Sequence, residues 1–135
     1  MPQLIEQQRA QFALHAIESA LNTPESQIYK HKEVKSYARR LPAMIQSNGF
    51  GQAMAFYYSK RDKFHAYGRI YTLVEDWLCG QGQVYANVQE NPRLLKAITQ
   101  HDQMAYRRAQ AETLALMIWV KKFAEALISG EAESD

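Results

Sequence analysis

The side chains that most often carry catalysis are scattered along this chain. The four histidines, at positions 15, 31, 65 and 101, show none of the spacings that build a metal or acid–base site. No Glu-x-x-His or His-Glu-x-x-His sequence occurs, which excludes the usual helical di-iron and zinc motifs. The glycines form no Walker A loop. The sequence therefore predicts no catalytic residues, no metal site and no cofactor.

Two further features look chemical but have simpler interpretations. Cys79 is the single cysteine, so no internal disulfide can form, and a reduced environment is expected. A lone cysteine near a helix end is more often a small packed side chain than a nucleophile. Glu75 and Asp76 are adjacent acids, and neighbours on a helix point in different directions. We expect both carboxylates on the surface.

Charge is distributed unevenly along the chain. Nine basic and two acidic residues lie between Lys30 and Arg69, whereas Phe123–Asp135 carries four acids and no base. Such segregation favours partners of both signs, and the alternative is a solvated face beside an acidic tail. Tyr57 and Tyr58 precede Lys60 and Arg61, a combination that can stack bases and neutralise phosphates. Spacing alone favours a different arrangement, with position 56 and Tyr57 in the core, Tyr58 half-buried, and residues 60–63 in a solvated turn.

The elements that must position these residues are helices. With 135 residues, 47% hydrophobic content, 6 Gly and 4 Pro, the chain is expected to be one packed domain spanning residues 1–135. Apolar residues recur at three- and four-residue spacing, which is typical of amphipathic helices. The sequence predicts an all-α, compact bundle of about five or six helices, over Gln3–Leu21, Tyr29–Ser47, Gly51–Lys60, Lys63–Cys79, Pro92–Gln100 and Asp102–Ile128.

Helix-breaking and helix-capping residues set the expected boundaries of the helices. Pro42 should kink the second helix or start a new segment, and Asn48-Gly49 should end that helix. Asp62 and Asp102 are expected N-caps of the helices that follow them. Residues 84–88 resemble a strand but have no partner strand, so they are predicted to be a loop.

The last long helix contains the longest apolar run, residues 114–120. Because this run is apolar all round, the helix is expected in the middle of the bundle, with a frayed acidic tail from about residue 129. The run is far too short to span a membrane, and the N-terminus lacks the apolar run of a secretory signal. A cytoplasmic protein with no membrane association is expected.

Two segments carry a family resemblance. The segment Tyr37–Lys60 (YARRLPAMIQSNGFGQAMAFYYSK) has a Leu-Pro pair, an apolar Ile, an Asn-Gly-Phe-Gly turn and a short apolar helix ending at Ser-Lys. The segment Glu112–Ala126 (ETLALMIWVKKFAEA) has a Trp, a basic pair and Phe-Ala-Glu-Ala. In this order they resemble the small subunit of type III-B CRISPR (Cmr) effector complexes. Phe50 replaces the more usual Leu, and residues 80–91 match nothing in the pattern.

The matching residues are mainly scaffold. Asn48-Gly49 is expected to reverse the chain between two helices. Trp119 and Phe123, one turn apart, are expected to fill the core beneath that corner.

The resemblance implies a non-catalytic subunit in antiviral defence. Copies would stack head to tail beside the guide-RNA backbone, next to other Cmr subunits, and contact target RNA and guide RNA. Because pairing would carry the specificity, basic residues would neutralise phosphates without reading bases. From charge position, the expected phosphate-binding residues are Arg39, Arg40, Lys60, Arg61 and Lys63.

Other interpretations stay open. The basic stretch and the acidic tail could instead meet in head-to-tail stacking. The chain could also be a helical protein–protein adaptor with no nucleic-acid role. A small helical enzyme or ligand-binding bundle is the third alternative, which the absence of clustered ligands disfavours.

Overall fold

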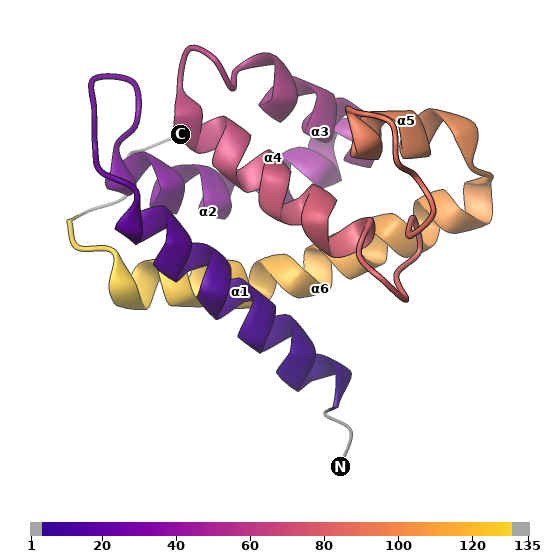
Figure 1. Cartoon of the computed structure of the whole chain (residues 1–135), viewed down its shortest axis with the longest axis horizontal. Helices are drawn as coiled ribbons and strands as arrows, with labels where there is room; N and C mark the ends of the chain where they lie inside the picture. Colours follow the sequence, from indigo (N-terminus) through magenta and orange to yellow (C-terminus); the bar gives the residue numbers. More distant parts are fainter. Residues whose placement is uncertain (1–3, 131–135) are drawn as a thin grey trace.

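A computed structural model describes residues 4–130 and shows an arrangement of helices (Figure 1). Within these residues there is no strand, only an isolated bridge between Ser26 and Tyr29. The predicted all-α fold is confirmed, while most of the predicted acidic tail lies outside the described residues. The helices are α1 (Ile5–Asn22), α2 (His31–Asn48), α3 (Phe50–Ser59), α4 (His65–Leu78), α5 (Arg93–Gln100) and α6 (Gln103–Leu127).

The longest helix, α6, organises the bundle by packing on α1, α2 and α4 (Figure 1). The short helix α3 contacts α2, α4 and α5. Burying these apolar faces supplies the main stabilisation of the fold, at about 25 cal/mol per Å² of apolar surface. The fully buried core includes Leu41, Ile70, Val74, Leu116, Met117 and Val120.

The helix α6 is less enclosed than its apolar run suggests. Leu116, Met117 and Val120 are buried, but Ile118 is 61% exposed. The helix does lie among α1, α2 and α4, as expected, but its apolar run is not covered all round. Its neighbours cover one side of α6, and Ile118 lies on the side that they leave open.

The corner between α2 and α3 forms where Asn48-Gly49 predicts it. Gly49 ends α2 with φ of 92° and ψ of 155°, a conformation that is essentially restricted to glycine. The residue that fastens this corner is Tyr106 of α6. Its hydroxyl accepts a hydrogen bond from the Gly51 N–H at 2.9 Å, and its ring packs edge-on to Phe50 at 5.6 Å.

The predicted place of Trp119 and Phe123 beneath this corner is wrong. The two rings stack on each other at 5.8 Å and are only partly buried. The Trp119 indole N–H donates to Glu6 of α1 at 3.2 Å. The reason is position along α6, because this half of the helix lies against α1 and leaves the corner to Tyr106.

Several predicted boundaries change. Pro42 starts no new segment, because α2 continues through it while Leu41 and Ile45 bury its apolar side. Asp62 is not an N-cap, since residues 60–64 form a turn that closes with a hydrogen bond from the Phe64 N–H to the Lys60 carbonyl at 3.0 Å. The helix α4 consequently begins at His65, with Phe64 as its N-cap.

Other local predictions are confirmed. Asp102 caps α6, and its carboxylate accepts from the Ala105 N–H at 2.9 Å. Residues 84–88 are a loop, in which Tyr85 is buried and donates its N–H to the Leu78 carbonyl at 2.9 Å.

The prediction that Glu75 lies on the surface is wrong. Its side chain is buried, and Oε2 accepts hydrogen bonds from the Tyr71 hydroxyl at 2.8 Å and the Leu94 N–H at 2.9 Å. The backbone at the start of α5 needs this acceptor, which sequence spacing does not reveal. Asp76 is exposed as expected and pairs with Arg93 at 2.8 Å.

Cys79 behaves as a packed apolar side chain. It is 5% exposed, and burial raises the pKa of its thiol to about 11. The thiol is therefore protonated at neutral pH and a poor nucleophile. In the described part of the chain, no group of three His, Cys, Asp or Glu side chains is placed to hold a metal ion. No helix among these residues has both the length and the apolar character to cross a membrane.

Candidate nucleic-acid interface

The five predicted phosphate-binding residues come from two elements. Arg39 and Arg40 lie in the middle of α2, and Lys60, Arg61 and Lys63 lie in the turn between α3 and α4. The turn begins where α3 ends, because the Lys60 N–H still donates to carbonyls of the last helical turn, at 3.3 Å. The cations of the turn are thus displayed at the junction of two helices.

An aromatic cluster joins these two elements. Its centre is Tyr67 of α4, which stacks on Tyr37 of α2 with ring centroids 3.7 Å apart and planes 7° from parallel. Three more rings meet Tyr67 edge-on, at 4.9 Å for Tyr57, 5.6 Å for Phe56 and 6.4 Å for Phe64. Aromatic pairs in such geometries contribute about 0.5–1.5 kcal/mol each beyond their buried area. The aromatic cluster therefore fixes α2 against the turn.

Three of the five cations lie on the aromatic cluster. The Arg40 guanidinium also donates to the Tyr67 hydroxyl at 2.6 Å. Cation–ring contacts of this kind contribute about 0.5–1 kcal/mol at exposed sites. The distances to ring centroids are 5.4 Å for Arg40 over Tyr37, 5.5 Å for Lys60 over Phe56 and 5.7 Å for Lys63 over Phe64.

The other two cations are placed differently. Arg61 stacks on Tyr58 at 3.7 Å and donates to the Tyr58 carbonyl at 2.7 Å. Its Cβ lies so close to Gly68 of α4 that a Cβ at residue 68 would be 2.8 Å away. Arg39 is exposed and makes none of these ring contacts. The structure thus brings Arg40, Lys60 and Lys63 onto one aromatic cluster and leaves Arg39 and Arg61 outside it.

Comparison with known proteins decides the family. The family model described as CRISPR-associated protein (Cas_Cmr5) matches residues 5–127. The chain belongs to this family. It also resembles the crystal structure of a CRISPR-associated Cmr5 family protein from Thermus thermophilus, with 26% identity and a TM-score of 0.71 over 95% of this chain and 100% of that chain. The resemblance to a Cmr small subunit is thereby confirmed, and membership implies association with other Cmr subunits.

In this Cas_Cmr5 family member, the packing of the aromatic residues differs in part from expectation. Tyr57 is fully buried and Tyr58 half-buried, as predicted. The expectation that Phe56 lies in the core is wrong, because its side chain is 37% exposed. One helical turn cannot bury both Phe56 and Tyr57 against the same neighbour, and Tyr57 occupies the inner position.

Sequence reasoning did not find the organising role of Tyr37 and Tyr67. Each tyrosine belongs to the apolar face of its own helix, so the spacing predicts only that both side chains are buried. Nothing in the spacing says that the two stripes face each other across α2 and α4. Burial raises the pKa of Tyr37, so its phenol adds no negative charge beside the three cations at neutral pH.

Proposed function

We propose that this Cas_Cmr5 family member is a non-catalytic, RNA-contacting subunit of a type III-B effector in antiviral defence. In this role it contributes positive charge to the channel in which target RNA pairs with guide RNA. The observation that carries the proposal is the convergence of Arg40, Lys60 and Lys63 on the aromatic cluster. Cations alone neutralise phosphates without selecting bases, which suits a subunit that must accept any guide.

The ring contacts favour binding for an entropic reason. A flexible lysine or arginine loses rotamer freedom when it meets a phosphate, at about 0.5–1.5 kcal/mol per side chain. Rings beneath Arg40, Lys60 and Lys63 already restrict these side chains. Arg39 and Arg61 neighbour these cations in the sequence, and we include both in the proposed phosphate-binding set.

Copies of the subunit are also proposed to stack in the complex. Support comes from the segregation of charge along the chain, because the basic stretch of residues 30–69 in one copy can meet the acids of residues 123–135 in the next copy in a head-to-tail contact. Sedimentation velocity over a range of concentrations should show a rising sedimentation coefficient. A constant monomer value for the free chain, together with a single copy per reconstituted complex, would contradict stacking.

RNA binding is best tested with a paired substitution in the turn. Lys60→Gln with Lys63→Gln removes two of the three converging charges and leaves the rings in place. Binding of two unrelated short RNAs should weaken about equally. For single strands the slope of log K against log salt should become less steep by about 0.7 per lost phosphate contact. Binding should be measured with the isolated chain and with the reconstituted complex.

The matched control is Arg107→Gln with Arg108→Gln, because both arginines are exposed and lie outside the basic stretch. It should change the salt slope much less than the turn variant. Equal losses of RNA affinity in both variants would contradict the proposed phosphate contacts. A loss of affinity for only one of the two RNA sequences would contradict them as well. Unchanged binding in the reconstituted complex would favour the protein–protein adaptor.

A further inference from the structure

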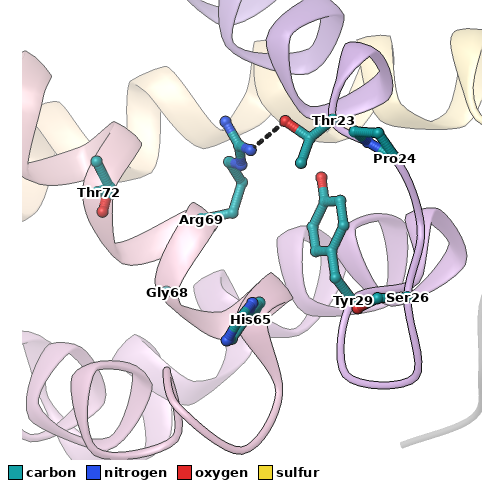
Figure 2. A pocket seen from close by; sticks show the side chains of 8 residues that line it. All are labelled: Thr23, Pro24, Ser26, Tyr29, His65, Gly68, Arg69 and Thr72. Carbon is teal, nitrogen blue, oxygen red and sulfur yellow. Dashed lines mark hydrogen bonds between the residues drawn. The ribbon is translucent and has the colours of Figure 1, made fainter.

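A pocket whose lining includes charged and hydroxyl side chains lies between the loop that follows α1 and the first half of α4 (Figure 2). Its volume is about 290 Å³. Figure 2 shows Arg69 projecting from α4 toward Thr23, with Tyr29 on the facing loop and His65 one turn earlier on α4. Neither the family match nor the proposed RNA contacts assign a role to this pocket.

Arg69 supplies the charge of the pocket. Its guanidinium donates to the Thr23 hydroxyl at 2.5 Å and the Ser19 hydroxyl at 3.3 Å, and it lies 5.7 Å from the centre of the Tyr29 ring. It forms no ion pair within residues 4–130, whereas Arg9 and Arg93 each pair with a carboxylate. Two of the five N–H donors of Arg69 thus meet neutral oxygens, and no carboxylate among residues 4–130 lies within ion-pair distance of its guanidinium.

The other polar side chains of the pocket are suited to an anion. His65, Arg69 and Thr72 follow at spacings of four and three, so they share one face of α4. The Ser26 oxygen accepts from the Ile28 N–H at 3.2 Å, which leaves its own proton for another acceptor. No carboxylate lines the pocket.

We propose that this pocket binds a phosphate group, with Arg69 as its main ligand. The planar guanidinium can donate two parallel hydrogen bonds to phosphate oxygens, a geometry that a lysine cannot reproduce. His65 and Thr72, on the same face of α4, supply the additional donors, whereas Ser26 lies with Tyr29 on the facing loop, away from Arg69 (Figure 2). The phosphate belongs either to a small molecule, such as a mononucleotide, or to an RNA strand, because Gly68 connects the pocket to Arg61 of the basic turn.

Inorganic phosphate is the first probe. In a titration of the full chain followed by amide NMR at constant ionic strength, the Thr23, Gly68 and Thr72 signals should shift saturably. Arg69→Gln should weaken the apparent affinity about tenfold or more, the usual effect of losing a charged hydrogen bond. Arg107→Gln, at an exposed arginine of α6, should leave the affinity unchanged. Absence of a saturable shift, or equal affinity in wild type and Arg69→Gln, would overturn the proposal.

Arg69 also donates hydrogen bonds to Thr23 and Ser19, so its substitution could lower affinity by disturbing the fold. A second variant separates this effect from a loss of phosphate contacts. His65→Gln alters an exposed side chain at the pocket and should weaken phosphate binding severalfold without changing the circular dichroism spectrum. Arg69→Lys should retain part of the affinity, because charge remains and the fork is lost. Full affinity in both variants would count against the pocket.

Competition then identifies the source of the phosphate. A short RNA that displaces inorganic phosphate indicates a strand, and displacement by uridine monophosphate alone indicates a small ligand. Displacement by neither contradicts a phosphate-ester site. Lys60→Gln with Lys63→Gln should leave inorganic phosphate binding within about twofold of wild type, since these charges lie outside the pocket lining. Failure of the proposed RNA contacts would therefore leave the pocket result intact.

Discussion

Glu112 connects three helices through one carboxylate. It pairs with Arg9 of α1 at 2.5 Å and accepts from the Trp77 indole N–H of α4 at 3.0 Å, while it belongs to α6 itself. The hydrogen bond from Arg9 is the main reason that the pKa of Glu112 lies below its ordinary value of 4.5, and the hydrogen bond from Trp77 lowers the pKa further. Stabilisation from a depressed pKa is present above the unfolded-state value and is lost as the pH falls through the folded-state value.

We therefore predict that Glu112→Gln lowers the free energy of unfolding at pH 7 by about 1.5–3 kcal/mol, the usual range for charged hydrogen bonds. The difference between wild type and variant should shrink as the pH is lowered below 4.5. Urea unfolding of wild type and variant at a series of pH values measures this difference in the free energy of unfolding. Glu125→Gln, at an exposed position of the same helix, is the control. A difference that does not depend on pH would assign the effect to packing.

At the scale of elements, the α2–α3 corner depends on one glycine. Gly49→Ala places a side chain where φ is 92° and should lower the free energy of unfolding by about 1–3 kcal/mol. Gly51→Ala is a matched control two residues away. A Cβ there would meet Ile98 at 3.4 Å and Tyr106 at 3.5 Å, which is ordinary contact, so stability should be unchanged or slightly higher. Equal losses in both variants would contradict this account of the corner.

The contact between α4 and the basic turn depends on Gly68. In Gly68→Ala the new Cβ would lie 2.8 Å from the Arg61 Cβ, so the turn must move. We expect a loss of about 1–3 kcal/mol from overpacking, reduced by up to about 1 kcal/mol of added helix propensity. Chemical denaturation of a double-mutant cycle with Arg61→Gly tests this, because removing the opposing Cβ should restore most of the loss. Additive losses would place the strain elsewhere.

At the scale of the whole molecule, a single folding domain remains a prediction. Both tryptophans report on α1, because Trp77 packs on Phe12 at 5.0 Å and Trp119 donates to Glu6, whereas the Tyr37–Tyr67 stack joins α2 and α4. If one core joins these helices, tryptophan fluorescence, tyrosine near-UV circular dichroism and far-UV circular dichroism should give coincident urea transitions. A tryptophan transition that precedes the tyrosine transition would show that α1 unfolds separately.

Local sequence signals determined the helices and the family. Spacing of apolar residues predicted every helix within a few residues of its ends, and Asn48-Gly49 and Asp102 marked the corner and a cap that the structure confirms. These signals suffice because helix formation and chain reversal depend on residues close together in sequence. The basic stretch likewise predicted which cations to consider for RNA.

Only the tertiary structure decided which side chains meet. It placed Tyr106 rather than Trp119 at the corner, buried Glu75 beneath the start of α5, and brought Arg40 to the turn through Tyr67. It also assembled the Arg69 pocket from α4 and a loop that begins 46 residues away in sequence, at Thr23. Apolar periodicity gives each helix a buried face without naming the partner of that face, because burial is non-directional and many pairings bury similar area.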